Sequence, residues 1–126
     1  MQHRTKCGFI VSKVICVFLT LSCHLTLGGQ SCLPNGIIFT SQSQLNTFAI
    51  ENQGCFEILG DVLIRGNDIT NLDPLNTIQS IKGNLRINDN PKLTNLNGLN
   101  TLKSIGGFLT VFNNSILISI SDLNNL

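Results

Sequence analysis

The chain has 126 residues, of which 42% are hydrophobic and 12% are charged, a balance that excludes a disordered protein and allows one folded domain. Its formal net charge is +1, and no cluster of Lys and Arg supplies the basic surface that nucleic-acid binding requires. Three of the eight basic residues lie in the first thirteen positions, so the remaining chain has five basic against seven acidic residues.

Residues 1–29 have the pattern of a secretory signal peptide. A basic start is followed by a mostly apolar run over residues 14–27, and Gly28 and Gly29 then supply small residues for cleavage. We therefore expect an exported protein that is secreted or held at the cell surface.

Two alternatives to a cleaved leader remain open. A membrane anchor would need ~20 apolar residues, and this run is shorter and is interrupted by Ser22, Cys23 and His24. Lipid attachment would need a small residue and a leucine just before the modified cysteine, a pattern that neither Cys23 nor Cys32 shows.

Cleavage would remove Cys7, Cys16 and Cys23 and leave Cys32 and Cys55 as the two cysteines of the exported chain. Two cysteines in an oxidising compartment normally pair, so we predict a Cys32–Cys55 disulfide. A metal or redox site is the alternative, but the sequence has no Cys-x-x-Cys and both histidines lie in the leader. We expect no cofactor and no metal.

Residues 30–57 are predicted to form an N-terminal cap. The β-branched and aromatic residues 37–40 favour a short strand, and Ser41 with Gln44 three positions later has the pattern of a capping box. A helix of two to three turns should follow and end near Gly54. Its packing face is predicted from residues three and four positions apart: Leu45, Phe48 and Ala49.

Residues 58–126 contain one pattern written almost three times. Aligned on Gly60, Gly83 and Gly107, the copies are 23 and 24 residues apart. Their apolar residues fall into the columns Val62/Leu85/Leu109, Ile64/Ile87/Val111, Ile69/Leu93/Leu117, Leu72/Leu96/Ile120, Leu75/Leu99/Leu123 and Ile78/Leu102/Leu126. A fixed period with Leu or Ile at fixed offsets is typical of stacked repeats.

Alternation after each glycine predicts one β-strand per copy, and strands repeated in one direction would form a parallel sheet. The rest of each copy has an apolar residue at every third position separated by Asn, Gly, Ser and Thr, which favours short strands and turns over a helix. We predict a mainly β fold: a right-handed parallel β-helix or leucine-rich-repeat-like solenoid with a disulfide-pinned capping helix at its N-terminal end.

No catalytic constellation is apparent in the sequence, because the chain after the leader has no His and its carboxylates lie singly in polar turns. Calcium binding by residues 66–68 and 88–90 is an alternative, but neither segment follows an established calcium-loop spacing. The structural interpretation is that these Asn and Asp residues form hydrogen bonds to the backbone or to one another between neighbouring copies. Asn113 begins a glycosylation sequon, which has meaning only in a eukaryotic secretory route.

The runs over residues 60–64, 68–72 and 78–87 resemble the receptor L-domain, the leucine-rich β-helical repeat of insulin and epidermal growth factor receptors. Bacterial surface proteins with such repeats are still more similar, with a mature start like residues 31–37 and a cap that holds a cysteine like Cys55. The resemblance covers residue 31 to the end. It implies a secreted or cell-surface, non-enzymatic repeat domain, often within a much longer chain.

Two functions follow as expectations. The first is a module that binds protein or glycan through the outward face of the repeated strands, and the second is a structural spacer that presents other domains. Strand alternation places the candidate ligand-binding residues on that face: Phe108, Phe112, Arg86, Arg65, Thr110 and Asn88. A loop or a further copy covering the two phenylalanines is the alternative.

The last residue, Leu126, occupies the same column as Ile78 and Leu102. Because terminal repeats need a polar cap for solubility, we expect the 58–126 region to be truncated. Either further copies follow or that end of the molecule self-associates.

Overall fold

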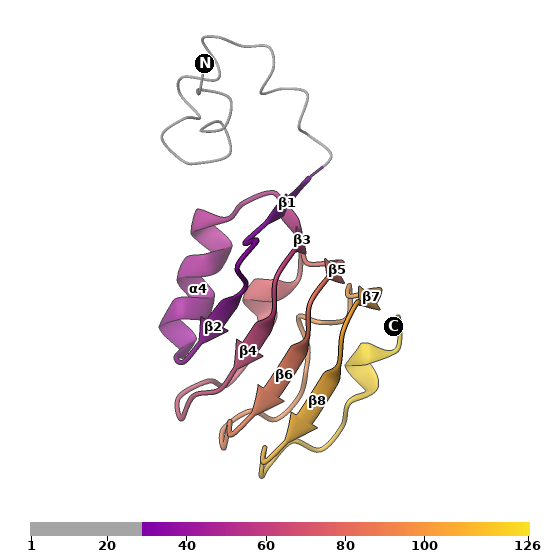
Figure 1. Cartoon of the computed structure of the whole chain (residues 1–126). Coiled ribbons are helices and arrows are strands. Elements are labelled where there is room, and N and C mark those ends of the chain that lie inside the picture. The colour runs from indigo at the N-terminus through magenta and orange to yellow at the C-terminus, as the bar shows by residue number, and fades with distance from the viewer. Residues whose placement is uncertain (1–28) are drawn as a thin grey trace, which may run out of the picture.

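The computed structural model describes residues 29–126, which form two parallel four-stranded sheets, one α-helix and two short 3-10 helices (Figure 1). Successive strands of the chain alternate between the sheets, so each pass adds one strand to each sheet. Sheet A consists of β1 (Gln30–Cys32), β3 (Cys55–Ile58), β5 (Ser80–Ile81) and β7 (Ser104–Ile105). Sheet B consists of β2 (Ile37–Phe39), β4 (Val62–Ile64), β6 (Leu85–Asn88) and β8 (Leu109–Phe112).

The predicted alignment of the copies is the register of sheet B. Val62 pairs with Leu85 and Leu85 with Leu109, and the same step joins Ile64 to Ile87 and Val111. The prediction of mainly β structure with parallel strands is therefore confirmed. The strand predicted over residues 37–40 is also present, as β2 at the end of this sheet.

The core lies between the two sheets and the turns that join them. The apolar columns of the first two copies are buried almost completely, with 0–2% of each side chain exposed. In the third copy, Leu109, Ile120 and Leu126 are 40%, 57% and 46% exposed. The difference has a simple cause, because among the described residues no strand pairs with the outer edges of β7 and β8.

The segment from sheet B back to sheet A consists mainly of turns, as predicted, with a 3-10 helix where the sequence had suggested only turns and strands. These helices are η1 (Asp73–Leu75) and η2 (Ser121–Leu123). This segment also accommodates the one-residue difference between copies. Asp89 and Asn113 occupy the extra position, and both have left-handed backbone angles, with φ of 60° and 54°.

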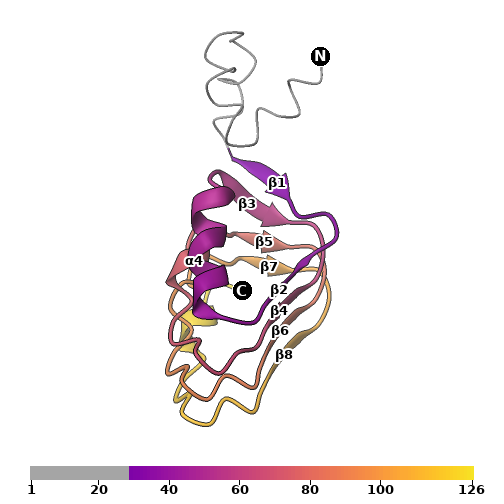
Figure 2. The same cartoon turned by 90° about the vertical axis from the view of Figure 1, so that its left-hand side faces the viewer.

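Helix α4 (Gln42–Glu51) lies across the end of the stack formed by β1 and β2 (Figure 2). Ser41 is its N-cap, as predicted, and its hydroxyl accepts the N–H of Gln44 at 3.2 Å. The reciprocal bond of the capping box is displaced by one residue. The side-chain carbonyl of Gln44 accepts the backbone N–H of Thr40 at 2.7 Å, and not that of Ser41. Leu45 and Phe48 are buried beneath the helix.

The expectation that Ala49 shares this packing face is wrong. Ala49 is exposed, while Phe48 packs edge-on against Phe39 of β2 with ring centroids 5.5 Å apart. The large side chains of Leu45 and Phe48 cover the end of the core, and the shorter side chain of Ala49 is not part of this packing.

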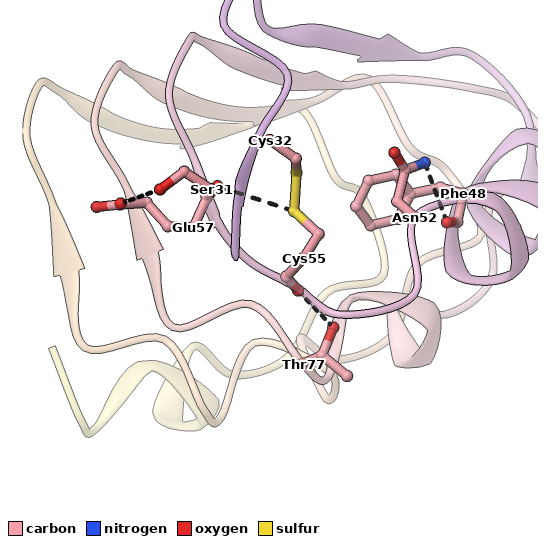
Figure 3. Close-up of a disulfide and its surroundings, with 7 residues drawn as sticks. All are labelled: Ser31, Cys32, Phe48, Asn52, Cys55, Glu57 and Thr77. Atoms are coloured by element: carbon pink, nitrogen blue, oxygen red, sulfur yellow. Dashed lines mark hydrogen bonds between the residues drawn. A yellow bond between two sulfur atoms is a disulfide. The ribbon is translucent and has the colours of Figure 1, made fainter. Parts of the chain in front are cut away.

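Cys32 and Cys55 form a disulfide, as predicted (Figure 3). Their Cα atoms are 5.8 Å apart, and the bond joins the neighbouring strands β1 and β3 of sheet A. Helix α4 lies between the two cysteines in sequence, so the bond closes the loop that contains the cap. Cys55 is buried, and its carbonyl accepts a hydrogen bond of 3.2 Å from the Thr77 hydroxyl of the following copy.

The predicted signal peptide lies, except for Gly29, outside the described residues. From residue 29 to 126 the structure contains no helix with the length and apolar character that a bilayer span requires.

Candidate functional site

The outward side of sheet B carries most of the residues predicted to bind a ligand. Along each strand the inward residues alternate with outward ones, and parallel register brings the outward residues into rows across the sheet. The central row is Ile38, Leu63, Arg86 and Thr110, flanked by the rows Asp61/Asn84/Phe108 and Arg65/Asn88/Phe112.

The structure places five of the six candidate residues where a partner can reach them. Phe108 is 74% exposed and Phe112 is 48% exposed, Arg86 and Arg65 are exposed, and Thr110 is half-buried. Thr110 and Phe112 belong to β8, Phe108 directly precedes that strand, and Arg86 of β6 is the partner of Thr110. The aromatic pair and the guanidinium group are therefore neighbours on one face.

Asn88 is the exception, because only 8% of its surface is exposed. Its amide nitrogen donates to the carboxylate of Asp89, in the turn that follows β6. Little of this side chain is left for a partner.

A polar row forms one border of the face. The backbone N–H of Asn84 donates to Asp61 at 2.8 Å and the Asn84 side-chain amide donates to the same carboxylate at 3.1 Å. The side-chain carbonyl of Asn84 in turn accepts the backbone N–H of Phe108 at 2.7 Å. The bonds that the backbone N–H and the side-chain amide of Asn84 donate to Asp61, together with the charge of Arg86, lower the pKa of Asp61 below its ordinary value.

The opposite border contains Asp89, which accepts hydrogen bonds from the side chains of Asn88 and Asn113. These bonds and the charge of Arg65 lower the pKa of Asp89. An open cavity of ≈ 280 Å³ lies beside Asp89 and is lined by Thr40, Arg65, Gly66, Asn67 and Asp89. Much of the hydrogen-bonding capacity of this border is thus used within the protein.

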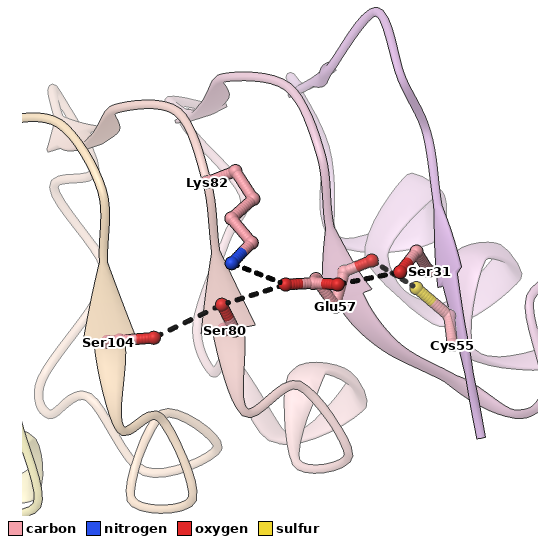
Figure 4. Close-up of polar contacts among 6 residues, drawn as sticks. All are labelled: Ser31, Cys55, Glu57, Ser80, Lys82 and Ser104. Atoms are coloured by element: carbon pink, nitrogen blue, oxygen red, sulfur yellow. Dashed lines mark hydrogen bonds and ion pairs between the residues drawn. The ribbon is translucent and has the colours of Figure 1, made fainter. Parts of the chain in front are cut away.

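A second polar row, on sheet A, was not predicted from the sequence. Glu57 accepts the hydroxyl of Ser31 at 2.6 Å and that of Ser80 at 3.4 Å, and it pairs with Lys82 at 3.0 Å (Figure 4). Ser104 continues the row by donating to the Ser80 hydroxyl at 3.1 Å. The bond from Ser31 is the main cause of the lowered pKa of Glu57, and Lys82 adds to it. In the sequence, only the recurrence of Ser at positions 80 and 104 indicated this row.

Asn90, one of the candidate calcium ligands, is hydrogen-bonded to the protein backbone. Asn90 is completely buried, and its side-chain carbonyl accepts the N–H of Gly66 at 2.8 Å. Its amide nitrogen donates to the Ile64 carbonyl at 3.1 Å, and Asn114 occupies the same position one copy later. The structural interpretation is confirmed for Asn90. Over residues 29–126, no three His, Cys, Asp or Glu side chains are grouped so as to hold a metal ion.

These features define a class of protein: a repeat-built module whose exposed face carries aromatic and basic side chains. A family model, the Receptor L domain, matches residues 54–126, more than half of the chain, and the protein belongs to this family. Receptor L domains are non-catalytic, ligand-binding modules found in the extracellular parts of receptors. No curated protein and no solved structure matches the chain.

Proposed function

We propose that this protein is an exported, non-enzymatic module that binds a protein or glycan through the outward face of sheet B. The observation that carries the proposal is the 74% exposure of Phe108 on the same face as Phe112 and Arg86. Aromatic and Arg side chains are enriched at protein interfaces, where aromatic rings bury large apolar areas and Arg supplies a planar group of hydrogen-bond donors. Family membership supports binding as the general role.

We further propose that the repeats form a right-handed parallel β-helical solenoid, with a cap over residues 30–57 and repeats over residues 58–126. Strands that alternate between two parallel sheets at intervals of 23 to 25 residues support this architecture, as in the steps Ile37 to Val62 and Val62 to Leu85. The resemblance to bacterial surface proteins and the leader pattern over residues 1–29 support secretion or surface display.

The proposal is tested with the wild-type chain and a Phe108→Ala, Phe112→Ala, Arg86→Ala variant on a glycan array and an array of extracellular proteins. A ligand bound by the wild type should be lost from the variant, while the unfolding free energy changes little because the three side chains are largely exposed. The matched control is Ile116→Ala with Ile118→Ala, two exposed apolar residues of the third copy that lie outside β8. Marked destabilisation of the first variant would assign its residues to the core and contradict the proposal.

A structural spacer is the second candidate. It is favoured by the polar rows on sheets A and B, where Asp61, Asn84 and Glu57 use their hydrogen-bonding groups on neighbouring strands. A wild-type chain that binds nothing on either array, and whose three-residue variant is equally stable, would favour this role.

A further inference from the structure

Among residues 29–126, one edge of sheet B is free at the capped end of the molecule. Strand β2 pairs there only with β4: the Ile37 N–H donates to the backbone carbonyl of Asp61 at 2.8 Å, and the Phe39 carbonyl accepts the backbone N–H of Arg65 at 2.9 Å. Because backbone groups alternate in direction along a parallel strand, the N–H and C=O of Ile38 face away from β4. The Ile38 side chain is 57% exposed.

Helix α4 forms the opposite wall of a groove along this edge. The groove is a cavity of ≈ 280 Å³ whose floor contains the packed rings of Phe39 and Phe48. On the helix side it is lined by residues one turn apart: Ser43, Thr47 and Glu51. The contact of Gln44 with the backbone and hydroxyl of Thr40 closes the groove where β2 turns into α4.

The polar side chains of the helix wall have no partner. Among residues 29–126, no hydrogen bond or ion pair joins the side chains of Ser43, Thr47 or Glu51 to the protein, in contrast to the bonded rows of the two sheets. Glu51 is also the last residue of α4, and the final turn contains no basic residue. A carboxylate at the C-terminal, partially negative end of a helix destabilises that helix. Residues that break a local rule in this way commonly serve binding.

We propose that the groove between β2 and α4 binds an extended peptide segment of a partner protein, which adds to β2 as a further strand and places a cation beside Glu51. The Ile38 N–H and C=O supply the two backbone hydrogen bonds, and the hydroxyls of Ser43 and Thr47 line the other side. Addition of a strand to an exposed sheet edge is an established mode of peptide recognition. This site lies at the β2 edge of sheet B and contains none of Phe108, Phe112 and Arg86, so it does not depend on the function proposed for those residues.

The direction of the chain sets where the cation lies on the peptide. Helix α4 runs back in the opposite direction to β2, so its C-terminal end lies toward the start of β2 (Figure 1). Glu51 is the last residue of α4 and lines the groove. All strand pairs in the described sheets are parallel. A peptide that adds in the same sense has its N-terminal end beside Glu51, and the cation is then its first residue.

The test uses the ¹⁵N-labelled full chain, expressed for export, and the peptide acetyl-Lys-Thr-Val-Thr-Val-amide. Millimolar peptide should shift the Ile38 amide resonance downfield, as expected for a new hydrogen bond. The reversed peptide acetyl-Val-Thr-Val-Thr-Lys-amide and a norleucine analogue of the first peptide should bind more weakly. The proposal would be overturned if the peptide did not shift the Ile38 amide resonance, or if the shifts were confined to β8. It would also be overturned if an uncharged oligosaccharide shifted the Ile38 resonance and the peptides did not.

Two variants separate binding from stability. Glu51→Gln should weaken the lysine peptide about two- to fivefold, the range of an exposed ion pair, while leaving the norleucine peptide unaffected. The same variant should unfold at an unchanged or higher temperature, because it removes an unfavourable charge from the helix end. Equal binding of the lysine peptide by Glu51→Gln would overturn the role of the carboxylate.

Ile38→Pro removes the N–H that faces the groove and should abolish binding, since edge strands tolerate Pro where the N–H points outward. Unchanged amide resonances in β6 and β8 would show that the Ile38→Pro variant is folded. If that variant does not fold, the comparison of Glu51→Gln with the wild type still tests the proposal. Asp73→Asn, a carboxylate outside the groove, is the control and should bind as the wild type does. The Phe108→Ala, Phe112→Ala, Arg86→Ala variant should still bind the peptide, which distinguishes this site from the face of sheet B.

Discussion

Asp68 holds the first residue of helix α4: both of its carboxylate oxygens lie 3.3 Å from the backbone nitrogen of Gln42. The Gln42 side-chain carbonyl in turn accepts the N–H groups of Thr70 at 2.9 Å and Asn71 at 3.2 Å. A carboxylate at a helix N-terminus satisfies a free N–H and interacts favourably with the helix dipole. The helix is thereby joined to the turn that follows β4.

Asp68→Ala should lower the free energy of unfolding by about 0.5–1 kcal/mol, because it removes this charge from the helix N-terminus. Urea denaturation measures the change. The neighbouring Asn67→Ala, an exposed side chain, is the control and should alter stability by less. Equal effects of the two substitutions would contradict the role given to Asp68.

Replacement of both Cys32 and Cys55 by Ser should lower the free energy of unfolding by about 3 kcal/mol. The bond closes a loop of 23 residues, and the loss reflects the greater entropy of the open unfolded chain. Denaturation of the variant beside the oxidised wild type tests this. The wild type should also be denatured in a reducing agent, after mass spectrometry has shown that both thiols are free. An unchanged free energy of unfolding would show that the disulfide does not stabilise the fold.

Asn90→Ala should lower the free energy of unfolding by about 2–3 kcal/mol. The side chain is fully buried, and its loss leaves the Gly66 N–H and the Ile64 carbonyl without their partner in the interior. Asn100→Ala, an exposed residue of the same copy, should be nearly neutral. A fully folded Asn90→Ala variant as stable as that control would mean that water replaces the amide at no cost.

Acid should destabilise the protein through Glu57. Its folded-state pKa is lowered by Ser31 and Lys82, so the carboxylate stabilises the fold above its unfolded-state pKa of about 4.3, and this contribution is lost as the pH falls through the folded-state value. Glu57→Gln should therefore flatten the dependence of the melting temperature on pH in the window between the unfolded-state pKa of about 4.3 and the lower folded-state pKa. Ser31→Ala should act in the same direction and more weakly. An unaltered acid dependence in both variants would contradict the assignment.

Self-association should proceed through the third copy, whose exposed apolar residues include Ile118 and Ile120, at 87% and 57% exposure. Exposed apolar patches promote contact between molecules. In sedimentation experiments the apparent mass of the chain should rise with concentration, and Ile118→Asp should reduce this rise. Ile50→Asp on α4, 68% exposed at the opposite end, is the control. A monodisperse monomer at all concentrations would contradict the expectation.

The repeat in sheet B was predictable from the sequence because each of its strands is marked by a glycine and two alternating apolar residues. Sheet A was not predictable in the same way. Strands β5 and β7 have two residues each, too few for an alternating pattern, and Ser80 and Ser104 resemble turn residues. Only the parallel pairing of β5 with β3, and of β7 with β5, makes them strands.

The candidate site was predictable in outline but not in detail. Alternation placed Phe108 and Arg86 on the outward face, and both are exposed. It placed Asn88 there as well, although the bond to Asp89 in the next turn leaves that side chain buried. The groove beside β2 could not be foreseen, because it depends on how α4 lies against Ile38, and a helix's placement is a tertiary feature.

The left-handed residues Asp89 and Asn113 have a consequence for how such a gene can change length. Within the copies the corner from sheet A to sheet B is constant, with four positions from Ile58 to Val62 and four from Ile81 to Leu85, whereas the cap has five from Cys32 to Ile37. The copies differ after sheet B, where a single residue with positive φ accommodates the added length. We therefore expect insertions and engineered guest peptides to be tolerated best at this turn, because the other corner is closely packed: a Cβ on Gly60 would overlap the backbone of Gly36.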